Sequence, residues 1–152
     1  MDTILIAIDG SPSAQEAVDF GLELAAGDGA TVTFVLVAPA VDILPAGGFG
    51  ITVPIPHEVT DRDAAPLDAA REQAEQHGVR AHTRLLKGDA VDEIVAYADT
   101  IDADVIVIGS RGHGALASAL LGSVSRGVLR EARRPVLVVR GTAAVAEAAL
   151  AQ

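Results

Sequence analysis

Short β-rich runs alternate with segments of helical period along this chain, and this alternation limits the possible folds more than any other feature. Five runs have strand character: Thr3–Ile8, Thr31–Ala38, Val79–Leu86, Asp104–Ile108 and Pro135–Val139. Strands that alternate with helices are typical of βαβ units, which build a parallel sheet. The pattern therefore predicts one doubly wound α/β domain with helices on both faces of the sheet.

The composition fits such a sheet and says what its core contains. Half of the 152 residues are hydrophobic, but only 3% are aromatic. The core must therefore be built from Val, Ile, Leu and Ala, which suits strands buried on both faces. The scarcity of aromatic side chains also leaves little surface on which nucleic-acid bases can stack.

The charge of the chain restricts its partners. The formal net charge is −10 at pH 7, and Lys87 is the only lysine. Affinity for nucleic acids and anionic membranes depends on clustered Lys and Arg, so we expect neither partner. An anion bound by this chain should be small and held locally. The acidic composition is compatible with a salt-adapted proteome and with an ordinary acid-leaning one.

The chain shows no signal for export. It contains no cysteine, which is compatible with a reducing compartment. Its first residues, MDTILIAIDGS, have no basic segment, and their apolar run is too short for a signal peptide or a membrane span. We therefore expect a cytoplasmic protein.

Helix boundaries are signalled by capping residues. Ser11 is expected to cap the first helix, with Pro12 at its first position, and Gly27 and Gly29 are expected to end it. Asp89 should cap a later helix, and Ser123 should cap the last one, over residues 123–132.

Two segments are less regular. Residues 39–57 mix Pro and Gly with Ile, Val and Phe, and we expect a functional or mobile loop whose glycines allow it to close over a ligand. Residues 58–76 predict a helix in which Pro66 indicates a late start or a kink.

The most informative stretch is GSRGHGALASALLGSVSR at residues 109–126, directly after DVIVI. A glycine loop between a buried strand and a helix can hold a phosphate through backbone N–H groups and the helix dipole. A Walker A loop is excluded because Ala115, not Lys, follows Gly114. A dinucleotide-binding fingerprint fits poorly. Such a fingerprint should follow the first strand, and an acidic residue should stand at the end of the next strand.

The spacing that remains is Gly109, Gly112, Gly122 and Ser123, a G-x2-G-x9-G-S pattern. It resembles the motif of the ATP-binding branch of the universal stress protein family. The segments ILIAIDGSPSAQEAVDFGLELA and LGSVSRGVLREARRPVLVVR also resemble that family, so the likeness covers residues 1–140. The Ala-rich tail, residues 141–152, lies outside it and is expected to be loose or helical.

The resemblance implies a nucleotide site. The phosphates of ATP would contact the backbone at Gly109, Gly112 and Gly122, and the hydroxyl and amide of Ser123. Asp9 would lie beside the ribose or a bound Mg²⁺, and Val37 would contact the adenine through its backbone.

Two further residues near the motif are weaker candidates for the same site. Arg111 is a cation that can pair with a phosphate, although a solvated arginine is the commoner case. Ser125 is equally well read as a phosphate contact and as a structural residue.

The resemblance also implies a flavodoxin-like sheet of strand order 3-2-1-4-5 and a homodimer formed through the last strand, Val136–Val139. In that order the ligand crevice lies between strands 1 and 4, whose carboxyl ends carry Asp9 and Gly109. A carboxylate facing a phosphate loop is suited to Mg²⁺, which takes one or two carboxylates together with phosphate oxygens. The family commonly has G-x-P where this chain has Gly88–Ala90, a departure we do not expect to affect binding directly.

The expected function is that of an adenine nucleotide-binding protein of stress response or regulation, with ATP, ADP or AMP as ligand. No catalytic residue is assigned, so at most weak ATPase activity is expected. Two alternatives stay open: a dimeric scaffold of the same fold without a nucleotide, and an FMN electron carrier, which the scarcity of aromatic residues disfavours.

Overall fold

The computed structural model describes residues 1–111 and 121–140. At its centre is a parallel five-stranded sheet in the order β5-β2-β1-β6-β7. Its strands are β1 (Thr3–Ala7), β2 (Thr31–Ala38), β5 (Ala81–Lys87), β6 (Val105–Gly109) and β7 (Val136–Val139). Counted along the chain within this sheet, the order is 3-2-1-4-5, so the predicted fold class is confirmed. The predictions for Gly112 and for the tail, residues 141–152, lie outside the described residues.

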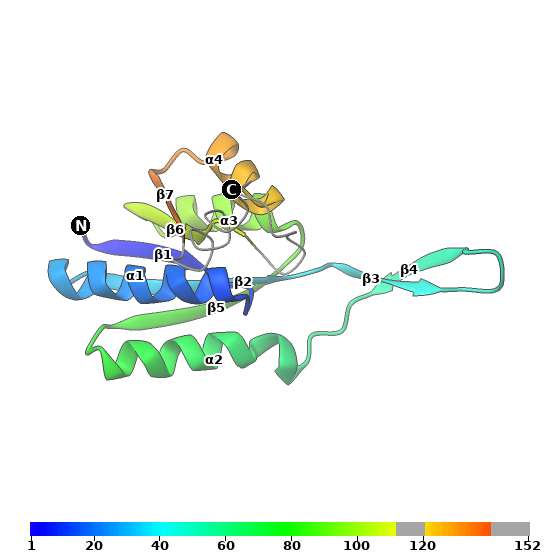
Figure 1. The fold of residues 1–152 in the computed structure, drawn as a ribbon, viewed down its shortest axis with the longest axis horizontal. Helices are drawn as coiled ribbons and strands as arrows, with labels where there is room; N and C mark the ends of the chain where they lie inside the picture. Colours follow the sequence, from blue (N-terminus) through cyan, green and yellow to red (C-terminus); the bar gives the residue numbers. More distant parts are fainter. Residues whose placement is uncertain (112–120, 141–152) are drawn as a thin grey trace, which may run out of the picture.

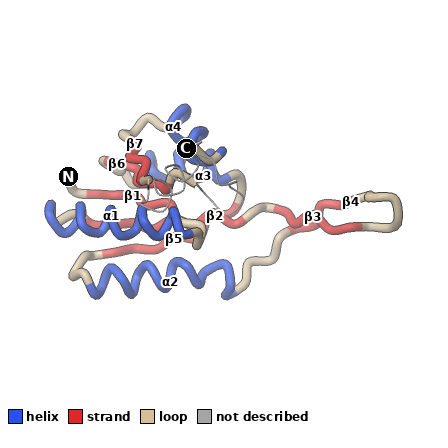
Figure 2. The backbone as a smooth tube through the Cα atoms, in the orientation of Figure 1, coloured by secondary structure: helices blue, strands red, loops and turns tan. Residues whose placement is uncertain are grey.

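Helices cover both faces of the sheet (Figures 1 and 2). They are α1 (Pro12–Asp28), α2 (Asp61–Gln76), α3 (Ala90–Thr100) and α4 (Ser123–Glu131). The strands point alternate residues to the two faces. Ile4, Ile6 and Phe34 pack with α1 and α2, whereas Leu5 and Ile106 pack with α3 and α4. The described residues contain no helix that is long and apolar enough to cross a bilayer.

The helix boundaries predicted from capping residues lie close to the observed boundaries, with small shifts. Ser11 caps α1 by accepting a hydrogen bond from the amide of Ala14 at 3.2 Å, and Pro12 is its first residue. The helix ends at Gly29, whose φ of 71° is left-handed; the expectation that Gly27 also ends it is wrong, because Gly27 lies inside the helix. Helix α2 starts at Asp61, three residues later than predicted, and Pro66 lies inside it.

The main departure from the sequence prediction is at residues 39–57. Instead of a loop, they contain an antiparallel hairpin of β3 (Val41–Pro45) and β4 (Thr52–Pro56). We call residues 41–56 the arm, because the hairpin projects far from the body of the domain (Figure 1). The loop prediction failed because proline disfavours strands, yet it is tolerated where its nitrogen faces away from the neighbouring strand.

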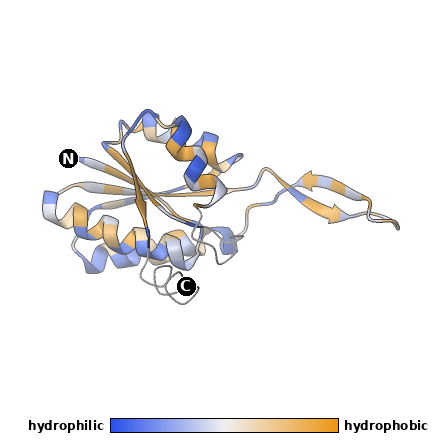
Figure 3. Cartoon of the chain, turned by 45° about the horizontal axis from the view of Figure 1, so that its top comes forward, coloured by the Kyte–Doolittle hydropathy of each residue, from blue (hydrophilic) through white to orange (hydrophobic). Residues whose placement is uncertain are grey.

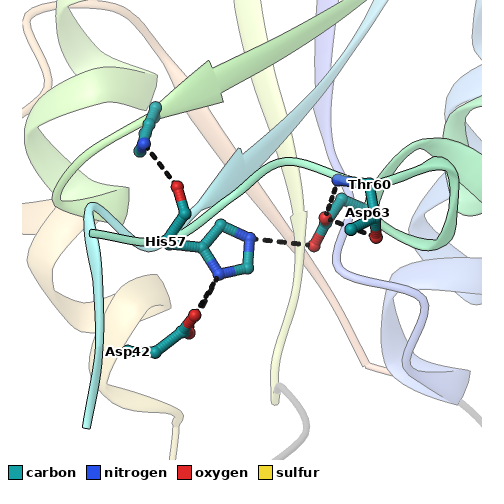
Figure 4. Close-up of polar contacts among 5 residues, drawn as sticks. Asp42, His57, Thr60 and Asp63 are labelled. Carbon is teal, nitrogen blue, oxygen red and sulfur yellow. Dashed lines mark hydrogen bonds and ion pairs between the residues drawn. The ribbon is translucent and has the colours of Figure 1, made fainter. Parts of the chain in front are cut away.

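A polar cluster around His57 ties the base of the arm to the domain (Figure 4). Nδ1 of His57 lies 2.9 Å from Oδ1 of Asp42 on β3, and Nε2 lies 3.3 Å from Oδ1 of Asp63 on α2. The side chain of Lys87 donates a hydrogen bond to the carbonyl oxygen of His57 at 2.6 Å. The hydrogen bond to Asp42, together with the negative charges of Asp42 and Asp63, raises the pKa of His57 above 6.5 in spite of partial desolvation.

This cluster predicts a pH-dependent anchor. A doubly protonated imidazole donates its Nδ1–H to Asp42 and forms an ion pair with Asp63, so the stabilisation is complete below the unfolded pKa and is lost as pH rises through the raised pKa. An NMR titration of the His57 ring should give a pKa above 6.5, lowered more by Asp42→Asn than by Asp63→Asn. A wild-type value at or below 6.5 would contradict this account.

A second local constraint lies where β6 ends against the start of α1. A Cβ added at Gly109 would lie 2.5 Å from the carbonyl oxygen of Ser13, a backbone atom that cannot move without shifting the helix. A Cβ added at Gly27, inside α1, meets nothing within 4 Å.

These two glycines predict opposite effects of the same substitution. Gly109→Ala should lower the free energy of unfolding by about 1–3 kcal/mol because it overpacks a tight contact. Gly27→Ala should raise the free energy of unfolding by about 0.5–1 kcal/mol because it removes a flexible residue from a helix. Urea denaturation measures both; equal effects of the two variants would refute the close approach at Gly109.

Candidate nucleotide-binding site

A cavity of about 310 Å³ opens at the carboxyl ends of β1 and β6. Its lining comes from β1, β2 and β6, the turn before α1, and the starts of α1, α3 and α4. Asp9 and Arg111 are the only charged residues among those described in its wall. The cavity thus lies where the direction of chain winding reverses, which is the expected ligand position in an open α/β sheet.

One side of the cavity is apolar. Val35 and Val37 contribute from β2, and Ala90 and Ile94 from α3. Only Val37 was predicted from the sequence. Val35 lies two residues before it on the same strand, so the strand period gave a signal for it. Ala90, the first residue of α3, stands where the family commonly has proline, and it lines the cavity.

Asp9 lies in the turn between β1 and α1. One of its carboxylate oxygens accepts a hydrogen bond from the amide of Ser11 at 2.8 Å, which holds the carboxylate at the rim of the cavity. The residues described in the structure include no cluster of three or more His, Cys, Asp or Glu suited to a metal ion. Asp9 therefore fits Mg²⁺ only as one ligand beside the oxygens of a bound phosphate.

The start of α4 lies at the opposite wall. Its N-cap is Gly122, not Ser123 as expected, because Ser123 already has helical geometry as the first helical residue. The amide of Gly122 donates a hydrogen bond to the carbonyl oxygen of Ser110 at 2.8 Å, so it is engaged with the protein. Helical bonding begins with Arg126, whose amide donates to the carbonyl of Gly122 at 3.1 Å.

The amides of the first turn of α4 are therefore the donors that this wall offers. Ser123, Val124 and Ser125 precede the first helical hydrogen bond and all line the cavity. Such N–H groups have no partner within a helix, and they lie at the positive end of the helix dipole. The Gly122 amide, which was expected to contact a phosphate, is thus bonded to Ser110, and the amides without a helical partner are those that follow it.

The two serines differ in what their hydroxyl groups can do. Ser125 is buried, and its hydroxyl donates to the carbonyl oxygen of Gly109 at 2.8 Å. Ser123 is exposed at the mouth of the cavity. The hydroxyl of Ser123 is thus placed for a ligand, whereas that of Ser125 joins α4 to the end of β6.

Arg111 lies two residues after the end of β6, and its backbone is held in place. Its amide donates to the hydroxyl of Ser13 at 3.2 Å, and the residue lines the cavity. The amide of Ser110 donates to the carbonyl oxygen of Val139 at 2.9 Å, which continues the sheet beyond Gly109. The roles of Ser13 and Ser110 had no distinctive signal in the sequence.

The structure brings together every predicted binding residue that it describes. The cavity wall includes Asp9, Val37, Gly109, Arg111, Gly122, Ser123 and Ser125. Gly112, the remaining candidate, lies outside the described residues. No residue of the arm lines the cavity among the parts of the chain that the structure describes, so the proposed closing motion of residues 39–57 has no support in this conformation.

Comparisons with known proteins agree with this reading. Universal stress protein MJ0531 of Methanocaldococcus jannaschii is 35% identical over 140 residues, covering 90% of this chain and 81% of the relative. A crystal structure of a universal stress protein in complex with cAMP superimposes with a TM-score of 0.67 at 29% identity, covering 91% of this chain and 95% of that one. The universal stress protein of Archaeoglobus fulgidus in complex with dAMP gives 0.57 at 26% identity, with 91% and 96% covered.

One family model matches the whole of the described domain. The sequence model of the Universal stress protein family matches residues 1–140, the same range as the resemblance identified from the motif. The chain therefore belongs to the universal stress protein family.

Proposed function

We propose that this chain is a stress-response or regulatory protein that binds ATP, ADP or AMP in the cavity between β1 and β6. The observation that carries the proposal is the convergence of the predicted residues on one cavity with a helix start in its wall. The solved relatives in complex with cAMP and dAMP support an adenine nucleotide as the ligand class.

The two sides of the cavity suit the two ends of a nucleotide. The apolar wall formed by Val35, Val37 and Ile94 suits an adenine ring. The first turn of α4 suits phosphate oxygens, since its amides and dipole attract an anion locally although the chain carries a net charge of −10. Asp9 would contact the ribose or Mg²⁺, and Arg111 a phosphate.

The proposal includes little or no hydrolysis. Among the lining residues that the structure describes, none is a histidine or a lysine, and Asp9 is the only carboxylate. A cytoplasmic location, favoured by the lack of cysteine, is part of the same proposal.

The proposal also includes a homodimer through β7. This strand is at one edge of the sheet, and its residues are only partly buried. The amides of Ile106 and Ser110 donate to the carbonyls of Pro135 and Val139, so the alternate residue Val138 turns its N–H away from β6. That N–H is available to a strand from a second copy.

The class of function is tested by what the purified protein carries. We expect the supernatant of the heat-denatured protein to contain an adenine nucleotide, identified by chromatography and mass spectrometry. Flavin in that supernatant would establish the electron-carrier alternative. No ligand, together with no binding of ATP, ADP or AMP by calorimetry, would leave the scaffold alternative.

The geometry of the site is tested by its two serines. Ser123→Ala should weaken nucleotide binding about tenfold, as expected for one lost hydrogen bond to a charged group, without lowering stability. Ser125→Ala should lower the free energy of unfolding by about 1–3 kcal/mol because the buried Gly109 carbonyl loses a donor, and should bind nucleotide nearly as well. Calorimetry and urea denaturation would reject this placement if the two variants exchanged their effects.

A further inference from the structure

Most of the arm has the colour of hydrophobic residues in Figure 3. Cross-strand neighbours share a face, so Leu44 and Val53 lie on one side and Ile43 and Pro54 on the other. Both sides are open to solvent: Ile43 is 61% exposed and Leu44 46%. At the tip Phe49 is fully exposed and adopts a left-handed φ of 68°. A hairpin without a packed face is marginal in water, so a partner that covered this one would stabilise it.

The outer edge of β4 is closed to a further strand. The amide of His57 donates to the carbonyl of Ala40, which fixes the side of the strand that faces β3. Because this direction alternates along a strand, positions 54 and 56 face outward. Both are proline, so this edge lacks two of the N–H groups that another strand would need.

The outer edge of β3 is open over its first half. The amide of Ala46 donates to the carbonyl of Ile51, so by the same alternation Val41 and Ile43 turn their N–H and C=O groups outward. Only Pro45, near the tip, lacks an outward N–H. Within the described residues, β4 is the only strand paired with β3.

The arm carries far less charge than the rest of the molecule. The chain carries a net charge of −10, yet Asp42 is the only charged residue between positions 41 and 56. That carboxylate is paired with His57 at the base of the arm. Two copies of so acidic a protein repel each other over most of their surfaces, and the arm is a surface through which they can meet with little repulsion.

We propose that the arm joins two copies of this chain by pairing β3 antiparallel with β3 of a second copy about a two-fold axis. An exposed strand edge is self-complementary under such an axis, because each copy supplies the same N–H and C=O groups to the other. The result is a four-stranded sheet in which the proline-blocked β4 strands form both outer edges. Growth stops at two copies per sheet, and the apolar faces of the arms become continuous.

The experiment removes one edge N–H at a time. Ile43→Pro deletes an outward N–H from the open edge, and Thr52→Pro deletes one from the edge that is already closed; neither N–H takes part in the β3–β4 ladder. Sedimentation velocity of the full chain over a range of concentrations gives the mass of the assembly that each variant forms. We expect Ile43→Pro to halve the mass of the assembly and Thr52→Pro to leave it unchanged.

A measurement on the unmodified chain makes the test independent of how the proline variants fold. Hydrogen exchange followed by NMR should show the amides of Val41 and Ile43 protected and that of Thr52 unprotected, with protection lost on dilution. A wild-type assembly that Ile43→Pro leaves intact, or unprotected amides at both β3 positions, would overturn the proposal. A wild-type chain that is monomeric at every concentration would also overturn it and would assign the arm to a different protein.

The arm contact can be tested separately from the proposed interface through β7 and from the proposed nucleotide site. Val138→Pro deletes the outward N–H of β7 and tests that interface alone, and the arm variants leave every lining residue of the cavity in place. Loss of mass in Ile43→Pro with unchanged nucleotide binding would support the arm contact as separate from the site.

Discussion

Burial of the sheet on both faces is the constraint on which the rest of the structure depends. The central strands β1 and β6 are apolar at nearly every position, so helices must cover both sides. Parallel strands require crossovers, and the chain winds first outward through β2 and β5, then back past β1 to β6 and β7. The reversal separates the connections that follow β1 and β6 and leaves a cavity between their carboxyl ends. The position of the site is thus a consequence of how the core is covered.

An acidic protein can offer an anion site there because the attraction is local. Helix-start amides and the helix dipole act over the length of about one turn, whereas the surface carboxylates are screened beyond a Debye length of about 8 Å at physiological salt. Gly109 contributes by permitting close approach of β6 to α1, and Ser125 by joining α4 to the end of β6. The glycines of the motif are therefore partly packing residues, and the ligand-facing groups are those that this packing aims at the cavity.

The arm shows why part of the fold resisted prediction. Pro45, Pro54 and Pro56 favoured a loop in the sequence, and the same residues occupy outward positions of a hairpin, where a missing N–H costs nothing within the pair. Which side of a strand a proline faces depends on the register, and the register depends on contacts such as the His57 cluster between the arm and α2. The amino-acid composition does not indicate which register the two strands adopt.

The sequence by itself determined the α/β class, the positions of the five strands of the central sheet and most helix caps, because these depend on local periodicity and on capping side chains such as Ser11 and Asp89. The spacing of Gly109, Gly122 and Ser123 also identified the family, and the sequence indicated seven of the fifteen described residues that line the cavity. Only the tertiary structure decided that the Gly122 amide is bonded to Ser110, that Ala90 and Ile94 line the cavity, and that residues 41–56 form a projecting hairpin. Those features depend on contacts between segments that are far apart along the chain. Such contacts produce no periodic pattern in the sequence from which they could be predicted.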